Sequence, residues 1–271
     1  MNPENYYILP SLRYKKKVTV FSLVSVVVVG TCIYMGFDPT MLFTEFHYVV
    51  DLTQRMAPPH FELFWTNKTI FFSVLETISM AFLGSVFGGV LAILLAFLSA
   101  VNTMPLKAVR VLIGFSLMML RVIPALLVIL VFVVAVGLGA FAGMLTLVVG
   151  TIGTFGQLFT GIIENTESAP AEAITAVGAS RMQVIRYVIL PQVLPSFITN
   201  FFYSFDFNLR AAIGLGIFGG GGVGFELFMA MRILHYQDAL ALMCLIVLLI
   251  VLSERLSNFL RDKILSVGIL K

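Results

Sequence analysis

Residues 122–163 read VIPALLVILVFVVAVGLGAFAGMLTLVVGTIGTFGQLFTGII and contain no Asp, Glu, Lys or Arg. A helix needs about 20 apolar residues to cross the hydrocarbon core of a bilayer, where every backbone polar group must be paired internally. The stretch is therefore long enough for two crossings. Gly137-Leu138-Gly139 would separate them, with the first crossing starting near Val111 and the second near Ala140. This segment alone predicts an α-helical membrane protein.

Apolar segments of the same kind recur on both sides of this stretch. They lie at residues 18–37, 77–106, 197–216 and 239–253. The second is predicted to be helical from about Ser73, and the last reaches a full span by starting near Leu234. Asp206 and Arg210 interrupt the third, which is the least regular candidate. The sequence thus predicts an all-α bundle of about six transmembrane helices.

The composition excludes a soluble globular protein. Hydrophobic residues make up 59% of the 271 residues, charged residues make up 11%, and the mean hydropathy is +1.02. A soluble chain carries roughly 25% charged residues, because solvated groups must cover its core. Cys32 and Cys244 lie in apolar runs, which favours packed thiols over a disulfide framework. A net charge of +3 is too small to indicate a nucleic-acid partner.

The distribution of basic residues predicts the orientation, because Lys and Arg concentrate in cytoplasmic loops. With both termini inside, the outer loops carry three basic residues, Arg55, Lys68 and Arg232. The cytoplasmic segments carry twelve, namely Arg13, Lys15, Lys16, Lys17, Lys107, Arg110, Arg181, Arg186, Arg255, Arg261, Lys263 and Lys271. We therefore predict a multi-pass membrane protein with both termini in the cytoplasm.

The first apolar stretch has two interpretations, a cleaved signal peptide or a retained anchor, since a basic segment precedes it. No small-x-small cleavage site follows, and Thr31 before Cys32 is a poor lipoprotein site, which favours the anchor. The predicted divisions are a cytoplasmic segment at 1–17, the first helix and an outer loop at 18–70, a five-helix core at 71–256 and a cytoplasmic tail at 257–271. Residues 38–70 are expected to be irregular or partly interfacial, and the core includes a polar cytoplasmic loop at 164–196.

The polar loop predicts two short helices joined by an elbow. Ser168 marks a helix start, and Gly178 is a natural stop because glycine accepts the left-handed conformation. Ser180 and Gln183 form a capping-box pattern that opens a second helix. Pro191 is expected to end that helix, because proline lacks the backbone N–H that a helix needs. Such a pair suits docking into a groove on a partner, although an ordinary amphipathic connector has the same shape.

The residues of this loop resemble a family motif. Three spaced elements carry the resemblance, Glu172-Ala173-Ile174, Gly178-Ala179-Ser180 and Ile189-Leu190-Pro191. They are similar to the EAA loop of ATP-binding cassette (ABC) importer permeases, in which Glu-Ala-Ala, a glycine and Leu-Pro recur at fixed spacing. The sequence departs from the pattern at Ile174. The resemblance implies a coupling helix that docks on an ATPase subunit through Glu172, Ala173, Gly178, Ala179, Ser180, Arg181, Leu190 and Pro191.

A wider resemblance covers roughly residues 70–260. It is carried by Arg121-Val122-Ile123-Pro124, Gly137-Leu138-Gly139, Asn208-Leu209-Arg210 and the glycine-rich run at 219–224. Together these look like the phosphonate-type permease subfamily. Ala125 and Ala140 stand where that subfamily has an acidic residue and a proline. The resemblance implies transport of a small phosphorus oxyanion, and organophosphonates, phosphite and hypophosphite all stay open as ligands.

The resemblance also implies a location in a bacterial cytoplasmic (inner) membrane, and it implies the partners of the chain. They are a second copy of the permease, two ATP-binding cassette subunits and an extracytoplasmic solute-binding protein, with ATP and Mg bound by the ATPase. The chain itself has no glycine-rich loop before a lysine, no visible catalytic constellation and no metal-ligand spacing among His47, His60 and His235. We therefore expect no bound cofactor, metal or nucleic acid and no enzymatic activity of its own.

Gly219, Gly220, Gly221 and Gly222 allow two interpretations. Small residues in membranes often serve only to let helices pack closely. Four consecutive glycines, however, lose too much conformational entropy to persist in a plain helix. Irregular backbone at membrane depth must be buried in protein or line a cavity. We therefore predict a broken segment that borders the translocation path.

Arg210, and less directly Arg121, is predicted to face the same path, because a charged side chain in a span requires a partner or water. Each also has a structural explanation. Arg210 lies one helical turn after Asp206 and could pair with it. Arg121 could reach a membrane interface through its long side chain.

Other functions stay open on the sequence alone. The coupling loop would equally serve an importer for methionine or another small solute. A polytopic membrane enzyme would need paired acids, a nucleophile or a metal cluster. A channel-like protein without ATPase coupling would not need the loop at 164–196.

Overall fold

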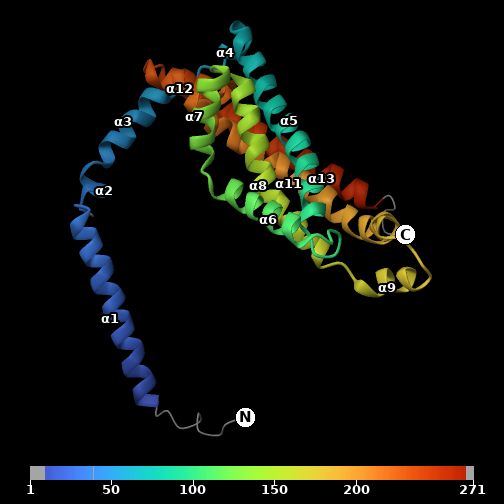
Figure 1. Cartoon of the computed structure of the whole chain (residues 1–271). Coiled ribbons are helices and arrows are strands. Elements are labelled where there is room, and N and C mark those ends of the chain that lie inside the picture. Colours follow the sequence, from blue (N-terminus) through green and yellow to red (C-terminus); the bar gives the residue numbers. More distant parts are fainter. Residues whose placement is uncertain (1–9, 39, 267–271) are drawn as a thin grey trace. The chain divides into compact units, whose positions relative to one another are not determined.

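The computed structural model describes residues 10–38 and 40–266, and within these ranges the chain forms helices and no strand. The all-α prediction is therefore confirmed. The chain divides between Arg55 and Met56 into two compact units. Figure 1 shows the helices in chain order, with the first unit in blue.

The first unit contains α1 (Pro10–Tyr34), α2 (Met41–Thr44) and most of α3 (Phe46–Met56). Residues 38–70 are more regular than the sequence suggested. Helix α3 is amphipathic, because Phe46, Val49 and Val50 recur at helical spacing on one face. An ion pair of 2.9 Å between Arg55 and Asp51 bridges one turn of this helix. The hydroxyl and backbone N–H of Thr40 donate to Asp38 and hold the pKa of that carboxyl below its usual value.

The second unit is a helix bundle that carries the candidate site. Its longer helices are α5 (Lys68–Ser99), α6 (Lys107–Val122), α7 (Ala125–Val136), α8 (Ala140–Glu164), α11 (Leu190–Leu215) and α13 (Tyr236–Ser266). Shorter helices lie between or before them, namely α4 (Leu63–Thr66), α9 (Ser168–Ala176), α10 (Arg181–Val184) and α12 (Gly222–Arg232). In the described chain as a whole, five stretches are long and apolar enough to span a membrane, and one of them, Lys17–Tyr34, lies in the first unit. The bent pair α6–α7 brings the number to six if the pair counts as one span.

The pair α6–α7 differs from the single crossing that the sequence suggested between Val111 and Gly137. The two helices are bent by 91°. Ile123 takes an extended conformation before Pro124, because the proline ring disfavours a helical conformation of the residue that precedes it. Helix α7 then ends at Gly137, which has φ +92°.

Close contact between α5 and α8 forms the centre of the bundle. Gly84 and Gly88 of α5 lie against Leu147 and Thr151 of α8, so closely that a side chain at either glycine would overlap them. Small residues permit this approach of two backbones in a membrane, where packing rather than the hydrophobic effect joins helices. Buried Asn208 of α11 donates to Ser85 of α5 at 2.8 Å and to Thr151 at 2.9 Å. These hydrogen bonds tie three helices together.

Candidate functional site

The loop between α8 and α11 folds as the helix–elbow–helix that the sequence predicts. Helix α9 ends at Ala176, and Gly178 reverses the chain with φ +92°. The elbow is closed by backbone hydrogen bonds from Gly178 to Thr175 at 3.0 Å and from Ala179 to Ile174 at 3.1 Å. Nothing lies within 4 Å of the position that a side chain at Gly178 would take. Glycine is therefore required here by backbone conformation and not by lack of space.

Helix α10 starts at the predicted capping box. The backbone N–H of Ser180 donates to Oε1 of Gln183 at 2.7 Å. The expected stop at Pro191 is wrong, because helical structure continues through a π-helical turn, Ile185–Ile189, directly into α11. The wider π turn precedes Pro191, whose ring would otherwise clash with a carbonyl of the preceding turn. The elbow thus leads into helical structure that is continuous from Arg181 to Leu215.

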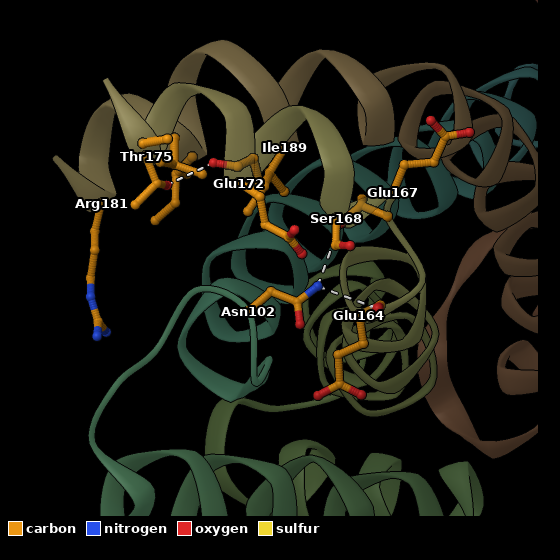
Figure 2. A pocket seen from close by; sticks show the side chains of 13 residues that line it. Asn102, Glu164, Glu167, Ser168, Glu172, Thr175, Arg181 and Ile189 are labelled. Atoms are coloured by element: carbon orange, nitrogen blue, oxygen red, sulfur yellow. Dashed lines mark hydrogen bonds between the residues drawn. The ribbon is translucent and has the colours of Figure 1, made fainter. Parts of the chain in front are cut away.

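Most of the predicted docking residues are exposed to the surroundings of the bundle or to a cavity beside α9. Glu172, Ala173, Gly178, Ser180, Arg181, Leu190 and Pro191 are exposed, and Ala179 is half-buried. Val177 and Met182 flank the elbow and are 85% and 72% exposed. A cavity of about 610 Å³ lies between α9 and the end of α8, with Glu164, Glu167, Glu172 and Arg181 among its lining residues. Figure 2 shows these side chains.

The glycine-rich segment is broken as predicted. Helix α11 ends at Leu215, and a π-helical turn, Gly216–Gly220, follows, with non-helical backbone at Phe218 and Gly219. Gly219, Gly221 and Gly222 all have positive φ. The backbone N–H of Gly139 donates to the carbonyl of Gly219 at 2.8 Å and fixes the break against the α7–α8 turn. Figure 1 shows α12, which starts at the break, and α9 at opposite ends of the bundle.

Helix α5 supplies contacts to this break that the sequence analysis missed. Oε2 of Glu76 accepts a hydrogen bond from the backbone N–H of Gly222 at 3.1 Å, and Oγ1 of Thr77 accepts one from Val223 at 2.9 Å. These groups satisfy N–H donors of the first turn of α12, which have no partner within the helix. Glu76 is the sole Asp or Glu between Glu62 and Glu164. An acidic residue inside an apolar span is the signal that could have found it.

The structure does not bring the two predicted arginines to a common partner. Nη1 of Arg121, in the last turn of α6, donates to Oε1 of Gln157 on α8 at 2.8 Å. Arg210 pairs with Glu254 of α13 at 3.4 Å. The suggested pairing of Arg210 with Asp206 is therefore wrong, since the carboxylate of Asp206 points to hydroxyls on α13.

Asp206 accepts hydrogen bonds from Ser253 at 2.8 Å and from Ser257 at 3.1 Å. The side chains of both Arg210 and Glu254 are about half exposed, at 47% and 55%. Both lie in helical stretches that are long and apolar enough to span a membrane. Lipid is a poor environment for such a pair, so this face of the bundle requires water or a protein partner.

Residues 88–265 match the family of binding-protein-dependent transport system inner membrane components. The chain belongs to this family. It is accordingly a multi-pass component of a membrane transport system. The matched residues include the α9–α10 loop, Arg121, Arg210 and the glycine-rich break, whereas Glu76 lies before them.

Several curated permeases are similar to the chain. A phosphite transport system permease from Stutzerimonas stutzeri is 35% identical over 238 residues, which cover 87% of this chain and 85% of that protein. A phosphate-import permease from Mycolicibacterium smegmatis is 36% identical over 87% of this chain, and the chain spans only 46% of that relative. A putative cryptic phosphonate permease of Escherichia coli K12 is 39% identical over 44% of this chain and 97% of that protein. The resemblance to phosphonate-type permeases is confirmed.

Solved structures support the permease fold at lower sequence identity. An inward-facing methionine ABC transporter gives a TM-score of 0.63 at 19% identity and covers 72% of this chain and 95% of that chain. A bacterial alginate ABC transporter gives a TM-score of 0.61 at 14% identity, with 91% and 98% covered. These likenesses concern the fold alone.

Proposed function

We propose that this permease is the membrane-spanning subunit of an ATP-driven importer for a small phosphorus oxyanion. Similarity over 87% of the chain to permeases named for phosphite and for phosphate carries the proposal. The substrate candidates are phosphonate, phosphite and hypophosphite, to which the Mycolicibacterium relative adds phosphate. All are compact anions, so one path with a fixed positive charge would serve any of them.

The importer would contain two copies of the permease, two ATPase subunits that bind ATP and Mg²⁺, and an extracytoplasmic binding protein. The exposed elbow supports this arrangement, because Val177 and Met182 leave apolar surface on its two sides, and such surface suits a protein partner. The α9 end would then face the cytoplasm. ATP binding would move α9 and favour one of two states of the permease, provided that the ATPase holds α9 differently in each state.

Methionine is a weaker alternative as substrate. Two D-methionine permeases, from Vibrio cholerae and Pasteurella multocida, are 27% and 28% identical to the chain. A channel without ATPase coupling is also a weaker alternative. It would give no role to the α9–α10 loop, which is ordered by the capping box of α10 and by the elbow at Gly178.

Reconstitution tests the proposed function directly. The permease, purified with its ATPase, would be placed in proteoliposomes and supplied with the binding protein, and uptake of phosphite, phosphonate, hypophosphite, phosphate and D-methionine would be measured. We expect ATP-dependent uptake of at least one phosphorus oxyanion. Uptake without the ATPase, or of D-methionine alone, would contradict the proposal.

Reporter fusions test the orientation. Fusions after Arg110, Gln183 and Lys271 are expected to report a cytoplasmic location, because basic residues flank these sites. Fusions near Thr53 and Met231 are expected to report the outside. Activity of an alkaline phosphatase fusion at Gln183 would place α9 outside and leave the ATPase nothing to dock on.

The pair of Arg210 and Glu254 yields a test of the anion path. Arg210→Gln is expected to lower uptake about tenfold while the permease still assembles, because a fixed positive charge favours entry of an anion. An arginine at the centre of a span costs about 2.5–3.5 kcal/mol on insertion scales, so its removal does not by itself destabilise insertion. Initial uptake rates in proteoliposomes measure the effect.

The double variant Arg210→Gln, Glu254→Gln separates the two roles. If the pair is only structural, removal of both charges restores uptake, whereas an anion-guiding Arg210 leaves it low. Asp206→Asn is the matched control one turn away, because its Oδ1 still accepts from Ser253, and we expect near wild-type uptake. Recovery in the double variant refutes the guiding role of Arg210.

A further inference from the structure

The short loop between α5 and α6 is hydrogen-bonded to the end of α8. Nδ2 of Asn102 donates to the carbonyl oxygens of Ile163 at 2.9 Å and Glu164 at 3.3 Å, and it lies 3.4 Å from Oγ1 of Thr166. In the opposite direction, Oε1 of Glu164 accepts from the backbone N–H of Val101 at 2.9 Å. We call these contacts the Asn102 clamp, and Figure 2 shows Asn102 beside Glu164.

The clamp lies at the surface, directly above an apolar cluster. Ala96, Ala100, Phe159, Ile163, Ile189 and Val193 are buried in this cluster and join α5, α8, the π turn before α11 and α11 itself. Asn102 and Glu164, in contrast, are exposed. The clamp can therefore open without burial of an unpaired polar group, because water replaces the lost partners. Its loss is also compatible with a folded bundle, because the apolar cluster remains.

The clamp acts at the point where α9 leaves the bundle. Only residues 165–167 separate Glu164 from the start of α9. The backbone N–H of Glu167 donates to Oε1 of Gln192 in the first turn of α11 at 3.1 Å. The beginning of α9 is thus fastened to α8 and α11, and through Asn102 to the α5–α6 loop.

The other end of α9 has a separate connection. It continues through the elbow into the helical structure that runs from Arg181 to Leu215 and ends at the glycine-rich break. At 1.5 Å per residue this helical structure is roughly 50 Å long. A displacement of α9 therefore reaches α8 and α11 through the covalent chain. It reaches the α5–α6 loop through the clamp, and α5 itself also through its packing against α8.

We propose that Asn102 is a positioning residue that transmits the movement of α9, through the end of α8, to the α5–α6 loop, so that the bundle follows the ATPase. The inference rests on the proposed function. With the clamp open, the α5–α6 loop no longer follows the end of α8, and more ATP is hydrolysed for each anion that is transported. The coupling between the ATPase docking site at α9 and the transport path in the bundle is a free-energy difference, and the contacts that connect the two sites supply it. Loss of the clamp therefore weakens this coupling.

The test compares uptake with ATP hydrolysis in the full complex of permease, ATPase and binding protein in proteoliposomes. Asn102→Ala is expected to reduce uptake about tenfold, the equivalent of two ordinary hydrogen bonds. Hydrolysis should fall far less, so the ATP used per imported anion rises several-fold. Glu164→Ala should act in the same way. Glu164→Gln should preserve coupling, because its amide oxygen still accepts from Val101.

Asn165→Ala is the matched control, because Asn165 lies in the same loop and its contacts are made by its backbone. It should leave the ratio of uptake to hydrolysis unchanged. An unchanged ratio in Asn102→Ala and Glu164→Ala overturns the proposal. A parallel loss of both activities with a lower unfolding temperature also overturns it, since that marks a merely structural contact. A wild-type complex that imports none of the anions contradicts the proposed function and the clamp together, whereas an active wild type isolates the clamp.

Discussion

Gly178→Val is expected to reduce import by at least tenfold while the permease still inserts in the membrane. Gly178 has φ +92°, a conformation that costs an L residue about 1–2 kcal/mol and is least tolerated by a β-branched one. A valine would drive the elbow toward negative φ and swing α9 away from its position relative to α10. Uptake and co-purification with the ATPase measure the result.

The open space around Gly178 makes the experiment specific to backbone conformation. Asparagine tolerates left-handed conformations, so Gly178→Asn should retain much of the uptake. Gly161→Ala is a second control, because Gly161 lies within α8 with nothing within 4 Å of the added side chain. Glu172→Lys tests the docking surface independently by reversing an exposed charge on α9. Normal import by both Gly178→Val and Glu172→Lys would remove the coupling role from this loop.

Features set by neighbouring residues were predictable from the sequence. The elbow followed from Gly178 alone, and the start of α10 from Ser180 and Gln183, because both depend on backbone geometry within one turn. The break at 219–222 followed from the entropy that consecutive glycines lose in a helix. The spans followed from the length of the apolar stretches.

Features set by distant contacts or by competing local rules were not predictable. Pro191 was expected to end a helix, but a π-helical turn before it allows the helix to continue. The packing of Ile189 and Val193 in the apolar cluster stabilises this continuous helix. Pro124, placed inside an expected crossing, bends the chain instead. The partner of Arg210 proved to be Glu254, which is 44 residues away, and the sequence offers no rule for such a choice.

The role of Glu76 was not predicted from the sequence, for a different reason. Its position in an apolar helix was visible, yet its role needed the structure, because its partner is a backbone N–H of Gly222. Together with Thr77 it holds the first turn of α12 against α5. The glycine-rich break is therefore an ordered junction of α5, α11 and α12, and its backbone packing should be as sensitive to substitution as the elbow.

Gly216→Ala is expected to abolish uptake and to lower the unfolding temperature of the detergent-solubilised permease. A β-carbon at Gly216 would lie 2.5 Å from the backbone nitrogen of Phe225 and 2.7 Å from the carbonyl carbon of Gly224. Both are backbone atoms, so no change of rotamer relieves the overlap, and α12 must separate from α11. Overpacking of this kind typically costs about 1–3 kcal/mol. Thermal unfolding and initial uptake rates measure the two effects.

Gly214→Ala provides the matched control, because Gly214 lies two residues earlier, in the last turn of α11. Nothing lies within 4 Å of a side chain added at Gly214, and alanine favours a helix over glycine by up to about 1 kcal/mol. Gly216 itself has helical φ −55° and ψ −38°, so alanine fits its backbone conformation, and only the contact with α12 distinguishes the two positions. We expect Gly214→Ala to match or exceed the wild-type unfolding temperature and to import normally. Equal losses of uptake and of unfolding temperature in both variants would show that helix conformation controls the break, and not the contact between α11 and α12. Wild-type uptake and unfolding temperature of Gly216→Ala would show that this close contact is not required.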